Sequence, residues 1–259
     1  RNAWIAMLFA AGMGIGLVFY GPMEPLALFL TPPPYLSGVE SGSQEAILPA
    51  FAQAVLHHAT LPWMIFALVG GALAYAAYRR GRIPLISSLF EPLITDSNNR
   101  VFGKIVDIFA VLVTLFGTAT SLGIGALQIR TGTSILTGKP LEGNGIMVVI
   151  ITILTILFIL SAMSGIKRGI RILSNINMGL VIGLAVFVLI TGPTLYILDL
   201  LPASLLQFFK HFEDMMSLSA SQGEPEKEFV TAWTMLYWAW WISWSPFVGM
   251  FIAKISRGR

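Results

Sequence analysis

Aromatic residues are concentrated near the C-terminal end of the chain. Five of its seven tryptophans lie between Trp233 and Trp244, and Tyr237 adds a ring among them. Trp240, Trp241 and Trp244 are spaced so that a helix projects them toward neighbouring faces. The faces of such rings can enclose a quaternary ammonium group, with about 0.5–2 kcal/mol for each desolvated contact. Ordinary aromatic packing is the alternative interpretation.

A glycine-rich stretch near the other end is a second candidate feature. Gly12, Gly14 and Gly16 occupy alternate positions, and each glycine weakens a helix by about 1 kcal/mol relative to Ala. Within lipid, backbone groups freed by unwinding persist only where they line a cavity or find other partners. The stretch predicts an unwound segment whose carbonyls can bind a cation, unless Gly12 and Gly16 form a close crossing between two helices.

Hydroxyl side chains mark a third candidate feature. Thr114, Thr118 and Ser121 follow an i, i+4, i+7 spacing, so a helix places them on one face. Oxygen ligands suit a hard cation such as sodium. The alternative is a packing face on which each hydroxyl bonds to a carbonyl of the preceding turn.

Few ionisable residues interrupt the apolar segments. His58 is either a satisfied polar residue near the outer surface or a proton relay. Glu24 and Asp107 lie near the ends of apolar segments, where we expect them to pair or to snorkel toward water. With no cysteine and three histidines, the chain shows no metal-ligand pattern.

Membrane-spanning helices are the elements that would position these residues. The 259-residue chain is 56% hydrophobic and 11% charged. A soluble domain is about 25% charged, so a soluble enzyme and a disordered chain are excluded. Helices that cross the hydrocarbon need about 20 apolar residues. Six blocks meet this length, at residues 3–30, 46–78, 106–128, 145–162, 172–198 and 229–253.

The segments between these blocks predict the arrangement in the membrane. Residues 202–217 are amphipathic and predict a helix on the membrane surface. With Arg1 placed inside, most Lys and Arg residues fall on the inner side and most Asp and Glu on the outer side, which is the positive-inside pattern. The basic loops are therefore expected in the cytoplasm and the chain in the plasma (inner) membrane. The net charge of +3 follows from these loops and does not indicate a nucleic-acid partner.

Several of these motifs resemble the betaine/choline/carnitine transporter family. The glycine stretch, Glu24-Pro25, and the segments 114–128 and 237–251 carry the resemblance, which covers essentially the whole chain. It implies an all-α membrane protein with a leucine-transporter-like fold of inverted five-helix repeats. This chain would hold the first repeat plus the first helix of the second, as a piece of a longer protein that often forms homotrimers.

The resemblance also implies the substrate and its site. It indicates a secondary active transporter for betaine-type or quaternary ammonium osmolytes. The family's substrate cage corresponds to Trp240, Trp241 and Trp244, and Met13 and Ser121 line the same site.

The family's aromatic box departs from its usual pattern in this chain. The box usually reads Trp, a second Trp five residues later and Tyr three residues after that. The corresponding residues here are His58, Trp63 and Phe66. Relative to the usual box, this chain lacks one indole and one hydroxyl. Another betaine, ectoine or proline therefore joins glycine betaine among the expected substrates.

Sodium is the coupling ion that the resemblance implies, with no other cofactor. One sodium site corresponds to Thr114, Thr118 and Phe247, and the second to carbonyls near Ala10 and Met13. Family members that couple choline uptake to protons tend to carry Asp in place of the last glycine of the stretch. Gly16 stands there in this chain, which favours sodium coupling and a zwitterionic substrate.

Other functions remain open on the sequence alone. Proton-coupled uptake of choline, ectoine or proline and substrate/product antiport are the nearest alternatives. A channel or a purely structural membrane subunit is a third class, and a channel predicts conduction in place of saturable uptake. An intramembrane enzyme, with Ser121 as nucleophile and a histidine as base, leaves the tryptophan cluster and the glycine stretch unexplained. We therefore expect a transporter that is not an enzyme.

Overall fold

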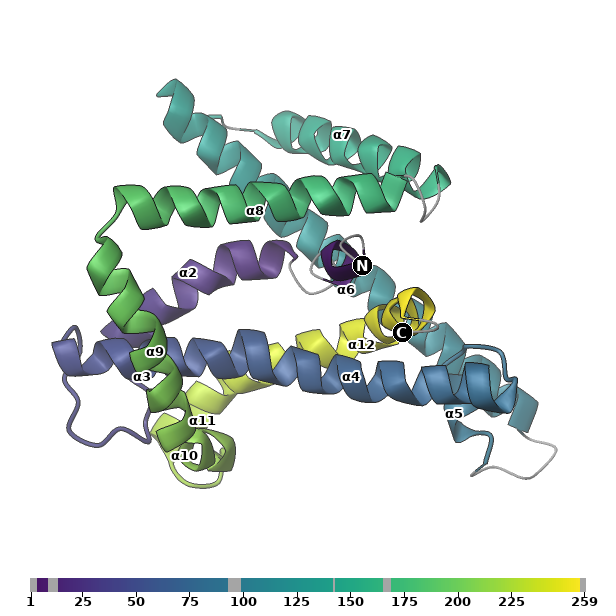
Figure 1. Ribbon diagram of the computed structural model, residues 1–259, viewed down its shortest axis with the longest axis horizontal. Coiled ribbons are helices and arrows are strands. Elements are labelled where there is room, and N and C mark those ends of the chain that lie inside the picture. Colours follow the sequence, from purple (N-terminus) through teal and green to yellow (C-terminus); the bar gives the residue numbers. More distant parts are fainter. Residues whose placement is uncertain (1–3, 9–13, 93–98, 142, 165–168, 257–259) are drawn as a thin grey trace. The chain divides into compact units, whose positions relative to one another are not determined.

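All regular structure in the described part of the computed structural model is helical (Figure 1). The structure describes residues 4–8, 14–92, 99–141, 143–164 and 169–256. Residues 4–8 are helical, and the further helices are α2 (Ile15–Leu30), α3 (Ile47–Val55), α4 (Leu61–Ala74), α5 (Ser87–Phe90), α6 (Asn99–Thr137), α7 (Asn144–Met163), α8 (Arg171–Thr191), α9 (Thr194–Lys210), α10 (Phe212–Ser217), α11 (Glu224–Phe229) and α12 (Met235–Ile255). Two π-helical turns join neighbouring helices: η2 (Leu56–Thr60) between α3 and α4, and η5 (Val230–Thr234) between α11 and α12. A further π turn, η3 (Tyr75–Arg79), follows α4 at the end of its helix.

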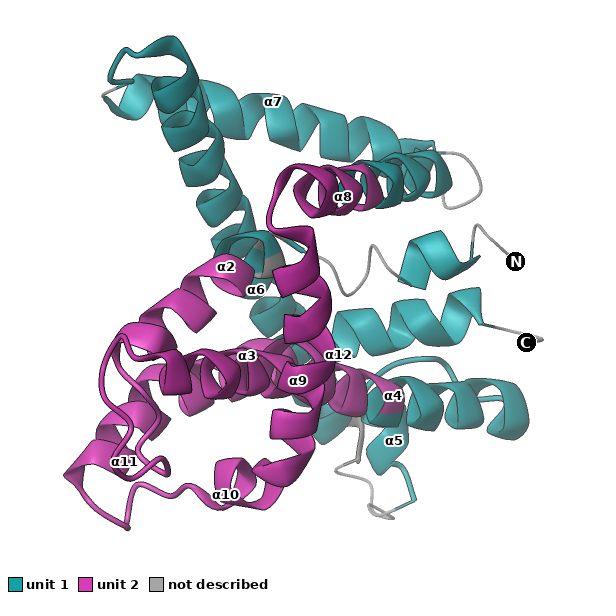
Figure 2. Ribbon diagram, turned by 60° about the vertical axis from the view of Figure 1, so that its left-hand side comes forward, with its two compact units in different colours: residues 1–19, 68–181, 243–259 teal, residues 20–67, 182–242 magenta. Residues whose placement is uncertain are grey.

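The chain divides into two compact units, coloured separately in Figure 2. Unit 1 comprises residues 1–19, 68–181 and 243–259, and unit 2 comprises residues 20–67 and 182–242. The boundaries fall within α2, α4, α8 and α12. In unit 1, α6 packs against α5 and α7, and in unit 2, α3 packs against α9.

Four helical stretches among the described residues are long and apolar enough to cross a membrane: Gln44–Arg79, Val101–Thr137, Asn144–Met163 and Arg171–Thr191. They coincide with the second to fifth predicted blocks. The first block yields the shorter apolar helix Val18–Leu30. The sixth is helical throughout, but its many Trp and Tyr rings lower its mean hydropathy. Together these helices make the chain a multi-pass, all-α membrane protein.

The predicted fifth block, 172–198, differs from the observed helices. α8 ends at Thr191 and α9 begins at Thr194, so the surface helix predicted over 202–217 starts earlier and divides into α9 and α10. Pro193 causes the break, because it has no N–H to donate and its ring obstructs the preceding turn. The apolar residues before Pro202 had extended the predicted span into α9.

The glycine stretch is interrupted in the described residues. Gly14 lies outside any helix, between helical residues 4–8 and α2. Gly16 is helical and buried near the start of α2, so of the two glycines that the structure describes here, Gly14 is the non-helical one. Gly12 lies outside the described residues. α2 therefore begins directly after Gly14, a residue type that lowers helix stability.

A proline explains the π turn η2 in the long helix that contains α3 and α4. Proline in a helix obstructs the carbonyl four residues earlier, and for Pro62 that carbonyl belongs to His58. Within η2, the backbone N–H of Leu61 bonds to the carbonyl of Leu56, five residues back. The wider turn lets Pro62 occupy the first turn of α4, where its missing N–H is tolerated.

Candidate functional site

A buried carboxylate lies at the centre of unit 2. Glu24 of α2 is fully buried, and both of its oxygens accept hydrogen bonds. His57 Nδ1 lies 2.5 Å from Glu24 Oε1, and the Tyr237 hydroxyl donates to Oε2 at 2.6 Å. His58 Nε2 is 2.9 Å from Oε2. Three donors from two other helical segments therefore replace the water that a carboxylate would otherwise require.

His57 connects two polar side chains of unit 2. The amide of Gln53, one turn earlier on α3, lies 3.1 Å from His57 Nε2. On the other side of the ring, Nδ1 lies 2.5 Å from Glu24 Oε1. A carboxylate only accepts, so His57 carries a proton on Nδ1.

Trp241 completes this arrangement from α12. Its indole Nε1 donates to the backbone carbonyl of His57 at 2.8 Å. That carbonyl has lost its helical partner, because the N–H of Leu61 bonds to Leu56 and the next residue, Pro62, has no N–H. The indole therefore satisfies a buried carbonyl that would cost about 1–3 kcal/mol if left unpaired.

Aromatic rings extend around the buried carboxylate. Trp233, Tyr237 and Trp241 follow an i, i+4, i+8 spacing and stack with ring centroids 6.4 and 6.2 Å apart. Trp240 stacks on Trp241, and the ring of Tyr20 meets Trp240 edge to face. Tyr237 is 0% exposed and Trp241 4%, so this ladder is the interior of unit 2.

The two remaining box residues lie beside the ladder. The ring of Phe66 meets Trp241 edge to face at 6.2 Å, and Trp63 meets Phe66 at 6.3 Å. Phe66 is 1% exposed, whereas Trp63 is 39% exposed. His58 meets Trp241 edge to face at 6.4 Å. The predicted box residues His58, Trp63 and Phe66 thus gather around one cage residue, Trp241.

In unit 1, Trp244 is seated between two glycines. A Cβ atom at Gly117 of α6 would lie 2.7 Å from Trp244 Nε1, and one at Gly14 would lie 3.2 Å from Trp244 Cη2. Only a residue without a side chain permits so close an approach of the indole to α6. The structure brings the predicted cage residue Trp244 together with the glycine stretch and with the hydroxyl-bearing helix.

The hydroxyls of α6 bond within their own helix. Thr114 donates to the carbonyl of Ala110 and Thr118 to that of Thr114, both at 2.8 Å. These are the back-bonds of the packing interpretation. Each hydroxyl oxygen still has lone pairs to offer a cation, because the bond uses only its proton. Ser121 Oγ is buried and bonds to no described group.

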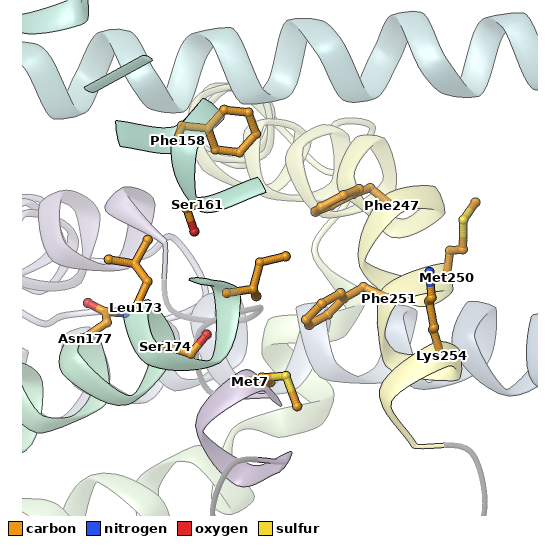
Figure 3. A pocket seen from close by; sticks show the side chains of 11 residues that line it. Met7, Phe158, Ser161, Leu173, Ser174, Asn177, Phe247, Met250, Phe251 and Lys254 are labelled. Carbon is orange, nitrogen blue, oxygen red and sulfur yellow. The ribbon is translucent and has the colours of Figure 1, made fainter. Parts of the chain in front are cut away.

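Phe247 lines a pocket of unit 1 that is mostly apolar (Figure 3). The pocket has a volume of about 660 Å³, and its polar residues are Ser161, Ser174, Asn177 and Lys254. Phe247 itself is 59% exposed.

Some predicted site residues fall elsewhere or outside the described part. Ala10 and Met13 belong to residues 9–13, which the structure does not describe. Trp240 and Trp241 belong to unit 2, whereas Trp244 and Ser121 belong to unit 1. Asp107 pairs as expected, accepting hydrogen bonds from the backbone and hydroxyl of Ser87.

Sequence reasoning underestimated Glu24. It pairs, as expected, but does not snorkel, because it is fully buried. The roles of Gln53 and Tyr20 were missed as well. A carboxylate between Pro22 and Pro25, in an otherwise apolar segment, was the available signal. A charge at such a position persists only when it has partners, and the two adjacent histidines of the next apolar block, His57 and His58, were candidates.

Comparisons with known proteins agree with this architecture. The family model described as "BCCT, betaine/carnitine/choline family transporter" matches residues 1–259. Over the full chain, 50% of residues are identical to the betaine/ectoine transporter LcoP of Corynebacterium glutamicum, of which the match covers 41%. The glycine betaine transporter OpuD of Bacillus subtilis is 45% identical over 99% of this chain and 49% of its own length.

A third relative, the high-affinity choline transport protein of Escherichia coli, is 39% identical over 99% of this chain and 37% of its own length. The chain thus spans half or less of these relatives. All three are named for transport and none for catalysis. The match of the whole chain to the family model means that this protein belongs to the betaine/carnitine/choline transporter family.

Proposed function

We propose that the full-length protein is a secondary transporter that takes up a zwitterionic betaine-type osmolyte together with sodium. The observation that carries the proposal is the seat of Trp244 between Gly14 and Gly117. It brings an aromatic face, a helix end and the hydroxyl-bearing helix α6 together within unit 1. An aromatic face attracts the cationic group of the substrate, and helix ends near the midplane are where transporters of this architecture bind substrate and ions.

The residues of α6 support sodium as the coupling ion. Thr114 and Thr118 hold their hydroxyls in fixed directions through their back-bonds, which orients the remaining lone pairs. Sodium entry down an inside-negative potential releases about 2.3 kcal/mol per charge per 100 mV. A zwitterion carries no net charge, so the membrane potential concentrates it only if a cation moves with it.

The names of the relatives support the substrate class. They are named for betaine and ectoine, for glycine betaine and for choline. Gly16 supports a zwitterionic substrate, because an acidic residue at that position would be needed to balance the net charge of choline. We also propose that the basic loops face the cytoplasm of a plasma-membrane protein and that the full-length protein forms a homotrimer.

The test is uptake of labelled glycine betaine and ectoine by cells or proteoliposomes that contain the full-length protein. The expected result is saturable uptake that requires an inward sodium gradient and stops when a sodium ionophore dissipates it. Potassium in place of sodium is the matched control. Equal uptake in sodium-free buffer would overturn sodium coupling, and a linear, non-saturable flux would overturn the transporter assignment in favour of a channel.

Proton coupling is a second candidate, favoured by one observation. Glu24, His57, His58 and Tyr237 form a buried cluster of four ionisable groups in unit 2. Ionisable residues placed within membrane segments often carry protons. If protons are the coupling ion, an imposed pH gradient, acidic outside, will drive uptake in sodium-free buffer, and Glu24→Gln will abolish that uptake.

A further inference from the structure

A second pocket of unit 1 lies between the end of α4 and the short helix α5, and its volume is about 390 Å³. Its apolar lining comes from Ala72, Ala76, Leu89 and Pro92, and its polar lining from Tyr75, Arg80, Arg82 and Ser88. It shares no lining residue with the pocket of Figure 3. It also contains none of the tryptophans or threonines assigned to transport, so it is a separate feature of the molecule.

The wall of this pocket that α5 forms is fixed to α6. Asp107 of α6 accepts hydrogen bonds from the backbone N–H and the hydroxyl of Ser87, the first residue of α5. At the other end of α5, the rings of Phe90 and Phe102 meet edge to face with their centroids 6.1 Å apart. Both ends of α5 are thus attached to α6, which gives the pocket a defined shape.

Arg82 is held at the pocket by two acceptors. Its Nε lies 2.6 Å from Glu91 Oε2, and one terminal amino group donates to the backbone carbonyl of Ser88 at 3.2 Å. A guanidinium has five N–H donors in a fixed plane, so these two bonds orient Arg82 and leave further N–H groups for a ligand. Glu91 offsets part of its charge but does not line the pocket.

Arg80 and Tyr75 provide a second set of donors. In the π turn η3, the backbone N–H of Arg80 bonds to the carbonyl of Tyr75, which brings their side chains together. Arg80 Nε donates to the Tyr75 hydroxyl at 3.1 Å, and Cζ lies 5.5 Å from the centroid of the Tyr75 ring. The two terminal amino groups of Arg80 have no acceptor among the described residues. The Tyr75 hydroxyl accepts this bond and keeps its own proton to donate.

The position of the pocket along the chain predicts its depth in the membrane. It lies at the end of the membrane-length helical stretch Gln44–Arg79. Tyr75 and Tyr78 are exposed there, as are Ile83 and Leu85 in the segment that follows. Tyrosines are typical of the boundary between hydrocarbon and water. We therefore expect the two arginines at the level of the lipid headgroups.

We propose that this pocket binds a phosphate group, with Arg80, Arg82 and the Tyr75 hydroxyl as donors. Guanidinium groups match phosphate oxygens with paired, charge-assisted hydrogen bonds, and the apolar lining contacts the substituent of a phosphate ester. The headgroup of an anionic phospholipid supplies such an ester at this depth, and inorganic phosphate supplies the same oxygens from solution. The positive charge of the pocket disfavours a lipid whose headgroup carries its own cation.

Native mass spectrometry of the full-length protein in detergent tests the proposal. Binding of phosphatidylglycerol is compared with that of phosphatidylcholine, which has the same phosphate and a cationic headgroup. Inorganic phosphate is the soluble competitor. The variants are Arg80→Gln and Arg80→Lys, of which Lys keeps the charge and loses the paired hydrogen bonds. Arg79→Gln is the matched control, because Arg79 is exposed and does not line the pocket.

We expect phosphatidylglycerol to bind the unmutated protein about tenfold more tightly than phosphatidylcholine. Arg80→Gln should weaken phosphatidylglycerol binding by about tenfold, the usual size of a charge-assisted hydrogen bond. Arg80→Lys should retain part of the affinity, and Arg79→Gln should bind like the unmutated protein. Retention of the lipid in an excess of inorganic phosphate identifies the lipid as the source of the phosphate. Its displacement, sensitive to Arg80→Gln, identifies free phosphate.

Equal affinities for phosphatidylglycerol in Arg79→Gln and Arg80→Gln overturn the proposal. If Arg80→Gln is not produced, Tyr75→Phe replaces it, because it removes one donor and keeps the ring; an unchanged affinity in that variant counts equally against the site. An unmutated protein that binds neither inorganic phosphate nor phosphatidylglycerol in preference to phosphatidylcholine also overturns the proposal. These measurements need no transport, so their outcome is independent of the proposed function.

Discussion

The indole nitrogen of Trp241 donates a hydrogen bond to the backbone carbonyl of His57, 184 residues away in the sequence, at 2.8 Å. Pro62 and the π turn η2 deprive that carbonyl of a helical partner. Trp241 therefore combines two roles, because its ring belongs to the aromatic ladder while its N–H fixes the turn that presents His57 and His58 to Glu24. The predicted cage residue is also a positioning residue.

Trp241→Phe separates these roles, since it keeps a ring and removes the N–H. We expect a loss of about 1–3 kcal/mol of stability, the cost of an unpaired buried carbonyl, measured by thermal unfolding in detergent. Adding Pro62→Ala, which supplies a backbone N–H to this turn, should restore part of the loss. Trp238→Phe is the control, because Trp238 is 38% exposed. Equal losses in Trp241→Phe with and without Pro62→Ala would contradict the assignment.

Gly117 is predicted to be essential for the seat of Trp244. In Gly117→Ala, the new Cβ would lie 2.7 Å from Trp244 Nε1 and 2.8 Å from Cδ1, so the indole must move. Overpacking of this kind costs about 1–3 kcal/mol, and we expect substrate affinity to fall by about tenfold or more. Gly123→Ala, on the same helix with no atom within 4 Å of its Cβ, should bind normally. Similar substrate affinities in the two variants would show that the packing of Trp244 against Gly117 does not matter for substrate binding.

Sodium coordination by α6 predicts a selective effect of removing two hydroxyls. Thr114→Val with Thr118→Val keeps the side-chain shapes and deletes two oxygen ligands. The apparent sodium affinity of uptake should fall, while substrate affinity at saturating sodium changes less. Thr120→Val removes a similar back-bonded hydroxyl from α6 and should have no effect. A sodium dependence unchanged by the double substitution would remove these threonines from the site.

Glu24→Gln tests the buried carboxylate. Three groups donate hydrogen bonds to the two oxygens of Glu24. In Gln, an NH2 group replaces one of these oxygens, so at least one of the three donors faces another donor and loses its acceptor. A buried donor left without an acceptor costs about 1–3 kcal/mol, and thermal unfolding should show a loss of that order. Glu45→Gln alters an exposed residue and should unfold like the unmutated protein. Unchanged unfolding of Glu24→Gln would mean that the cluster contributes nothing to stability.

The sequence by itself determined the class and most of the helices. Long apolar blocks, scarce charges and a specific tryptophan segment are properties of the chain that do not depend on how distant residues meet. They predicted helical membrane segments, and the motifs predicted the family. The limits of the helices were harder to predict, because hydropathy is continuous across Gly192 and Pro193 while the backbone is not: Pro193 removes a donor and obstructs the preceding turn.

The contacts at the site were decided only by the tertiary structure. Composition marked Glu24 as an unusual charge in an apolar segment, but nothing local states that Tyr237, 213 residues away, supplies one of its donors. Likewise, the spacing of Trp240, Trp241 and Trp244 suggests one cage, whereas the helix directs Trp241 into the ladder with Tyr237 and the fold seats Trp244 against Gly117. Hydrogen bonds and close approaches of this kind depend on distances between helices, and a linear pattern specifies the faces of a helix but not what meets them.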